Sequence, residues 1–195
     1  MITLNDIKQL ARSSGAETIS MRRHLHAHPE LSFEEKETST FIKTILDKLG
    51  IPWQPMAGTG VVGMITGALP GKRTIALRAD MDALPITEEN NAIYRSTRPG
   101  IMHACGHDAH TASLLSTAGI LQQLRPKFSG TIKLIFQPGE EVLPGGASML
   151  IKEGALDSPV QTLLSGNMWI HGYQRVLSQF GVVLLWHPWI NYVLL

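Results

Sequence analysis

Residues 100–113, GIMHACGHDAHTAS, place five side chains that could do chemistry within eight positions: His103, Cys105, His107, Asp108 and His110. Cys105 is the only cysteine of the chain. Divalent Zn, Mn, Co and Ni accept thiolate, imidazole and carboxylate ligands together. The stretch is therefore a candidate metal site. A cysteine nucleophile with its histidine base, or a helix that begins with histidines, would also account for these residue types.

The spacing favours a metal site. Cys105 and His107 flank a glycine, and in an extended segment side chains two positions apart point to the same side. Two residues this close in sequence orient each other poorly as nucleophile and base. A structural zinc site would need four closed ligands, typically two close pairs of Cys or His, whereas the remaining candidates here are carboxylates. The pattern predicts a catalytic metal site with Cys105 and His107 as ligands.

Two acidic pairs could complete this site. Of Glu140 and Glu141, one can bind a metal while its neighbour acts as the general base for water. In the other pair, Asp80 could cap a strand end, and Asp82 is better placed to orient a ligand histidine or to bridge metals.

The other histidines are weaker candidates. The sequence favours a place on a helix surface, or a supporting role beside a ligand, for His24, His26 and His28. For His103 and His110 it leaves open whether they support a ligand or face solvent.

Predicted strands and helices bring the acidic pairs and the histidine loop together. One strand, 73–84, ends around the two aspartates, and another, 130–141, ends at the two glutamates. A helix at 110–124 follows the histidine loop. Ligands in open α/β sheets bind at the carboxyl ends of strands, so we expect one shared site.

The remaining pattern completes an α/β layered domain. An amphipathic helix runs from about residue 5 to 28, before Pro29. Ser32 is expected to cap a second helix that ends at Gly50, with Glu35 at the capping-box position. A strand over 60–69, the turn PGK and a helix over 145–156 closed by a glycine follow.

Composition narrows the function class. The 195 residues carry a formal charge of +1 and contain no basic block, which argues against a nucleic-acid partner and an anionic membrane surface. A single cysteine cannot form an internal disulfide and fits a reducing compartment. The amphipathic N-terminus differs from a signal peptide, so we expect a cytoplasmic protein.

Five blocks between residues 21 and 159 resemble the metal-dependent N-acyl-amino-acid amidohydrolases, which include hippurate hydrolases and indole-acetyl-amino-acid hydrolases and are related to aminoacylase-like dimetal peptidases. These blocks are MRRHLHAHPELSFEE, ALRADMDALPI, HACGHDAHTASLL, LIFQPGEE and GGASMLIKEGAL. The resemblance implies a three-layer α/β/α catalytic domain with an inserted lid domain. It also implies two divalent ions (Mn, Zn, Co or Ni), an N-acyl amino acid as substrate, and homo-oligomers among intact relatives.

The resemblance also assigns residues. Cys105, His107 and Glu141 match metal ligands, Glu140 matches the catalytic base, and Asp82 matches the family's acidic position after the strand. An N-acetyl-diaminopimelate-type deacetylase is an alternative within the enzyme class. A non-catalytic remnant that binds metal or a partner is the alternative of another class.

The resemblance stops at about residue 159. The family has two further histidine ligands, one in a GQHV strand, and neither is evident here. From Ser158 onward Arg175 is the only charged residue, and three of the four tryptophans occur there. A membrane anchor or a variant C-terminus would be two explanations.

The genetic code offers a third explanation. Read from the third base of each codon, 161–170 permits DAIFGQHVD and 185–192 permits MASMDKL, and both strings resemble the family. We therefore expect 1–159 to be the N-terminal part of an incomplete catalytic domain without its lid. Residues 160–195 are then an out-of-frame tail, and a chain truncated in this way would have little or no activity.

Overall fold

The computed structural model describes residues 2–157, 159, 163–166, 175–176 and 184–185. Its helices are α1 (Leu4–Ala27), α2 (Lys36–Lys48), α3 (His107–Leu124) and α4 (Gly146–Lys152), with a short 3₁₀ turn at Arg125–Lys127. Its strands are β1 (Trp53–Met56), β2 (Gly60–Thr66), β3 (Leu69–Asp80), β4 (Ser129–Gln137), β5 (Leu163–Gly166), β6 (Arg175–Val176) and β7 (Leu184–Leu185).

Five strands form a mixed sheet in the order β1-β2-β4-β3-β5. β3 runs parallel to β4 and β5, whereas β2 is antiparallel to β1 and β4. The register pairs Asp80 with Gln137, so β3 and β4 end side by side. This shared edge puts the segments that follow both strands next to each other.

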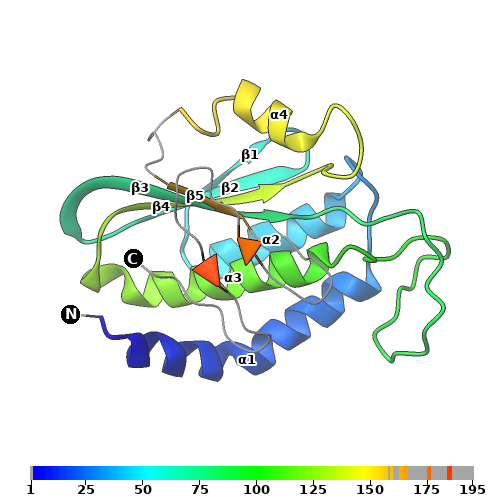
Figure 1. Cartoon of the computed structure of the whole chain (residues 1–195), viewed down its shortest axis with the longest axis horizontal. Coiled ribbons are helices and arrows are strands. Elements are labelled where there is room, and N and C mark those ends of the chain that lie inside the picture. Colours follow the sequence, from blue (N-terminus) through cyan, green and yellow to red (C-terminus); the bar gives the residue numbers. More distant parts are fainter. Residues whose placement is uncertain (1, 158, 160–162, 167–174, 177–183, 186–195) are drawn as a thin grey trace.

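Helices cover both faces of the sheet (Figure 1). α2 and α3 lie against one face, α1 packs against α3 on the outside, and α4 covers the opposite face. The described residues therefore confirm the predicted three-layer α/β/α arrangement. The inserted lid domain stays a prediction.

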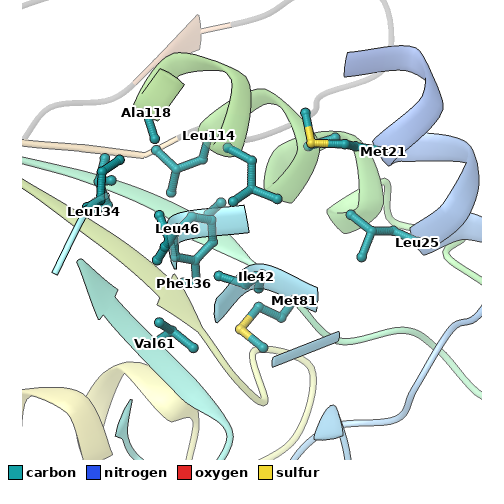
Figure 2. Packing of buried hydrophobic residues seen from close by; sticks show 14 of the residues in the cluster. Met21, Leu25, Ile42, Leu46, Val61, Met81, Leu114, Ala118, Leu134 and Phe136 are labelled. Atoms are coloured by element: carbon teal, nitrogen blue, oxygen red, sulfur yellow. The ribbon is translucent and has the colours of Figure 1, made fainter. Parts of the chain in front are cut away.

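The main core lies between the sheet and the helices α1, α2 and α3 (Figure 2). Phe136 and Leu134 of β4 are fully buried against Ile42 and Leu46 of α2. Burying a side chain of this size contributes about 1.5–3 kcal/mol to the free energy of folding, so this contact stabilises the packing of α2 on β4. Leu114 of α3, with Met21 and Leu25 of α1, extends the same cluster. This packing holds the β4 end and the start of α3 in fixed positions.

The predicted start of the second helix is wrong. α2 begins at Lys36, and its N-cap residue, Glu35, makes no capping hydrogen bond with its side chain. The Ser32 hydroxyl instead donates to Asp82 Oδ2 at 2.7 Å. The buried Glu35 carboxylate accepts hydrogen bonds from Thr59 Oγ1 (2.5 Å) and Gly139 N (2.8 Å). Tertiary partners at the sheet edge have displaced the local capping box.

Several strand and helix boundaries also differ from the sequence prediction: β2 ends at Thr66, β4 ends at Gln137 and α4 ends at Lys152. β1 was not predicted, because it has only four residues and one of them is proline. β3 begins at Leu69 and includes the PGK segment, with an irregularity between Leu69 and Thr74. α3 begins at His107, three residues earlier than predicted.

The tail is largely outside the described residues, so the predicted frameshift and the alternative membrane anchor both concern residues that the structure mostly does not describe. In the described part of the chain, no helix has both the length and the apolar character needed to cross a membrane.

Candidate metal centre

Three segments meet at the edge of the sheet where β3 and β4 end (Figure 1). Asp80 is the last residue of β3, and Asp82 follows two positions later. After β4, a Pro-Gly turn leads to Glu140 and Glu141. The α3 helix begins at the same edge with His107. The predicted convergence of these segments is confirmed.

The three predicted ligands Cys105, His107 and Glu141 lie together, with potential ligand atoms within 4.8 Å of one another. His107 is buried, Glu141 is partly exposed in its side chain, and Cys105 lies at the surface. The expected extended segment is absent here: Gly106 adopts a left-handed conformation with φ 91° and serves as the N-cap of α3. This turn, which favours glycine, joins the cysteine to the first helical residue.

Asp82 orients the His107 ring. His107 Nδ1 lies 2.9 Å from the Asp82 carbonyl oxygen and 3.2 Å from Asp82 Oδ1, so Nδ1–H donates and the Nε2 lone pair faces the other carboxylates. Asp82 Oδ2 in turn accepts from Ser32 Oγ and from the Glu141 backbone N–H at 2.9 Å. Of the two roles considered for Asp82, its contacts favour orienting a histidine over bridging metals.

The charge balance around Cys105 argues against a nucleophile. Partial desolvation of the sulfur, the hydrogen bond with Glu141 and the nearby negative charges raise the pKa of the Cys105 thiol to about 12. Catalytic cysteines need the opposite shift, because the thiolate is the reactive form. A divalent cation beside the sulfur would favour the thiolate, so the acidic surroundings suit a metal ligand better than a nucleophile.

The other groups of the cluster also depart from their ordinary pKa values. Burial lowers the pKa of His107, but the hydrogen bond with Asp82 and the charge of Asp80 outweigh it, and the net pKa is raised. Burial and the charges of Asp80 and Glu141 raise the pKa of Glu140. A carboxylate whose pKa is moved toward neutrality is better suited to take up and return a proton.

The donor set fits a divalent ion. It offers one sulfur, one imidazole nitrogen and one carboxylate oxygen, and Glu140 Oε2 lies 4.0 Å from His107 Nε2. Zn, Mn, Co and Ni are compatible with this mixture, and the residues do not select one of them.

A buried support holds the turn that carries the two glutamates. Gly139 has φ 51°, and its N–H donates to the buried Glu35 carboxylate. A Cβ added at Gly139 would lie 2.4 Å from the Phe33 ring, which leaves no room for a side chain. Sequence reasoning missed this support, because Glu35 resembled a helix cap.

The remaining histidines divide into different environments. His24 is exposed, as a helix-surface reading predicts, whereas His26 is buried against Asp108 and Glu88. His103 and His110 are both buried, so neither faces solvent. Burial lowers the pKa of His103 to about 4. His110 lies beside Asp80, which the sequence treated only as a strand cap.

The model of peptidase family M20/M25/M40 matches residues 76–178. The chain belongs to this family. The match includes Asp82, the Cys105–His107 loop and the two glutamates, the segments that meet at the sheet edge.

Named relatives agree with this membership. The chain is 45% identical over 169 residues to an N-acyl-L-amino acid amidohydrolase of Geobacillus stearothermophilus, covering 86% of this chain and 45% of the relative. It is 48% identical to an N-acetyl-L-cysteine deacetylase of Bacillus subtilis (strain 168), and the match covers 80% of this chain and 39% of the relative. The YXEP protein of Bacillus subtilis, described as a dinuclear metal binding peptidase, matches with TM-score 0.74 and 43% identity, covering 80% and 43%. The chain thus spans less than half the length of these relatives.

Proposed function

We propose that this chain carries the site of a metal-dependent hydrolase that cleaves the amide bond of N-acyl amino acids. The observation that carries the proposal is the meeting of Cys105, His107 and Glu141 within 4.8 Å, beside Glu140. The names of the amidohydrolase and deacetylase relatives support this substrate class.

In this proposal Cys105, His107 and Glu141 hold a divalent ion. When bound, the ion would supply Lewis-acid chemistry toward water and the amide carbonyl. Glu140 accepts the proton of the attacking water and returns it to the leaving amine, and its raised pKa suits both steps. Asp82 keeps the His107 ring in the tautomer that leaves Nε2 free to bind. The description of the YXEP protein supports two ions in an intact site.

Amino acid release from N-acyl amino acids tests the function. The chain is supplied with Mn, Co, Ni or Zn, and the primary amine set free is measured against time. Any release from this chain is expected to be slow, to depend on the metal and to be abolished by Glu140→Gln, while metal binding remains. Glu153→Gln is a matched control, because Glu153 accepts a backbone hydrogen bond from Ala57 and belongs to neither group of candidate ligands. Metal binding with no turnover would favour the non-catalytic remnant.

The predicted change of reading frame at about residues 158–161 is part of the proposal, because it lowers the expected turnover of this chain. The nucleotide sequence across 155–195 checks it directly: the alternate frame must encode DAIFGQHVD and MASMDKL. The protein encoded by a gene with the frame restored should then hydrolyse the substrates faster than the present chain. If the restored gene product binds metal but releases no amine, the proposed function is wrong.

A cytoplasmic location and a small-molecule substrate accompany this function. The single cysteine supports a reducing compartment, and the names of the amidohydrolase and deacetylase relatives support a small-molecule substrate. Homo-oligomerisation of intact relatives remains a prediction.

A further inference from the structure

A second group of metal-binding side chains lies on the buried side of the candidate centre. Asp80, His107 and His110 are all buried, and their potential ligand atoms lie within 4.8 Å of one another. Asp80 ends β3, while the two histidines sit on the first turn of α3 with their rings stacked at 5.6 Å between centroids. The group is therefore fixed by a strand end and a helix start, and not by a loose loop.

The spacing within this group suits a shared ion. Asp80 Oδ2 lies 3.9 Å from His107 Nε2 and 3.7 Å from His110 Nδ1. These separations exceed a hydrogen bond, which joins such atoms at about 2.7–3.2 Å. Two ligands that each bind an ion at about 2.0–2.2 Å lie about 3–4 Å apart, so the observed distances leave room for a cation between them.

Outer partners orient two of the three ligands. Arg78 pairs with Asp80 Oδ1, which directs Oδ2 toward the histidines, and Arg78 Nε donates to Gln137 Oε1 at 2.8 Å. The backbone oxygen of Asp80 accepts from Thr111 Oγ1 at 2.8 Å. His107 Nδ1 is occupied by Asp82, as described above. Metal ligands in proteins are commonly held by such partners.

We propose that Asp80, His107 and His110 form an inner position for a divalent cation, which alternates with the outer position at Cys105 and Glu141. Both positions need the Nε2 lone pair of His107, and one lone pair binds one ion. The inner position offers two nitrogens and one oxygen, which suits Zn, Co or Mn. The outer position has a thiolate, which is a soft ligand and favours softer metal ions.

Co²⁺ binding to the full chain tests the two positions, because a bound thiolate adds a sulfur-to-cobalt charge-transfer band. In Cys105→Ala we expect that band to vanish while Co²⁺ still binds with nitrogen and oxygen ligands. Adding His110→Ala, or the isosteric Asp80→Asn, to Cys105→Ala should weaken the remaining binding by about tenfold or more. His24→Ala in the same background is the control, because His24 is exposed and should leave binding unchanged.

Two results would overturn the inner position. One is complete loss of Co²⁺ binding in Cys105→Ala while its circular dichroism remains that of the parent chain. The other is a less than about threefold effect of both added substitutions. Either result leaves the outer position, and with it the proposed hydrolase, standing, so the two proposals fail separately.

Discussion

Two clusters of polar side chains flank the first turn of α3, and their distances differ. On one side, Asp108 Oδ2 accepts from His26 Nδ1 and from Arg22 Nε, both at 2.7 Å, and His26 Nε2 donates to Glu88 Oε1 at 2.9 Å. On the other side, His107 Nε2 lies 3.9–4.0 Å from the carboxylates of Asp80, Glu140 and Glu141.

The difference in distances distinguishes a buried ion-pair network from the proposed ligand site. Around Asp108 the opposite charges lie within hydrogen-bond distance, so Arg22 and His26 neutralise the Asp108 carboxylate directly. Around His107 three carboxylates surround one imidazole nitrogen at distances that an inserted cation would span. Adjacent residues of one helix therefore serve different purposes, and the distances to their partners reveal which.

Removing Asp108 should produce the largest change in stability. We expect Asp108→Ala to lower the free energy of unfolding by about 3–5 kcal/mol, because it leaves the buried His26 and its partners without their shared anion. Urea denaturation measures this loss. Asp47→Ala is the control, since the Asp47 side chain accepts an exposed hydrogen bond from Trp53 Nε1, and its loss should cost less than about 1 kcal/mol. Equal losses in the two variants would contradict the structural reading of the Asp108 cluster.

Removing His107 should affect metal binding more than any other single substitution. His107 Nε2 belongs to both ligand groups, so His107→Ala is expected to weaken Zn²⁺ or Co²⁺ binding by more than about 100-fold. Titration calorimetry on the folded variant measures the loss. If His107→Ala kept its full affinity for the metal, the group of carboxylates around His107 would not be a ligand site.

A smaller effect is expected for Asp82, which contacts the ligand histidine and is not itself needed as a ligand. Asp82→Asn should weaken metal binding by about 10–100-fold through loss of the ring orientation. The same calorimetric titration reports the change. An effect as large as that of His107→Ala would instead favour direct coordination by Asp82.

The smallest expected effect is the pH dependence of the His26 contribution. The hydrogen bond with Asp108 outweighs burial and raises the pKa of His26, while burial of Asp108 is outweighed by His26 and the pKa of Asp108 is lowered. The folded state therefore favours charged His26. Its stabilising effect is fully present below the unfolded pKa of about 6.5 and is lost as the pH rises through the higher folded pKa.

His26→Gln tests this sign. We expect the substitution to cost about 2 kcal/mol of unfolding free energy at pH 5.5 and less at alkaline pH. Urea denaturation of the parent chain and the variant at several pH values measures the difference. A cost that grows with pH would mean that neutral His26 is the form the fold stabilises.

Local patterns were sufficient to predict several features of the site. Glu140 and Glu141 follow a buried apolar strand, Cys105 precedes an apolar helix and His107 begins it, so their positions at the ends of these elements follow from the period of hydrophobic residues. The parallel pairing of β3 with β4 then brings the ends together, as expected for an α/β sheet.

Hydrogen-bond partners distant in sequence decided the roles of Ser32 and Glu35, which the local pattern did not predict. Ser32 and Glu35 have the spacing of a helix cap, yet Asp82 and Gly139, distant in sequence, bind them instead. Buried polar groups need partners, and folding supplied stronger ones than the helix end could.

By itself the sequence determined the layers of the fold, the ends of its main elements and the residue types available for metal chemistry, because these depend on near neighbours along the chain. Only the tertiary structure decided that His107 faces Cys105 and Glu141 of the candidate metal centre while Asp108 joins a buried ion network, and that Asp80 and His110 lie beside His107. Neighbouring side chains on one helical turn point in different directions, so each meets a different part of the fold. What each one contacts is set by segments that are distant in sequence.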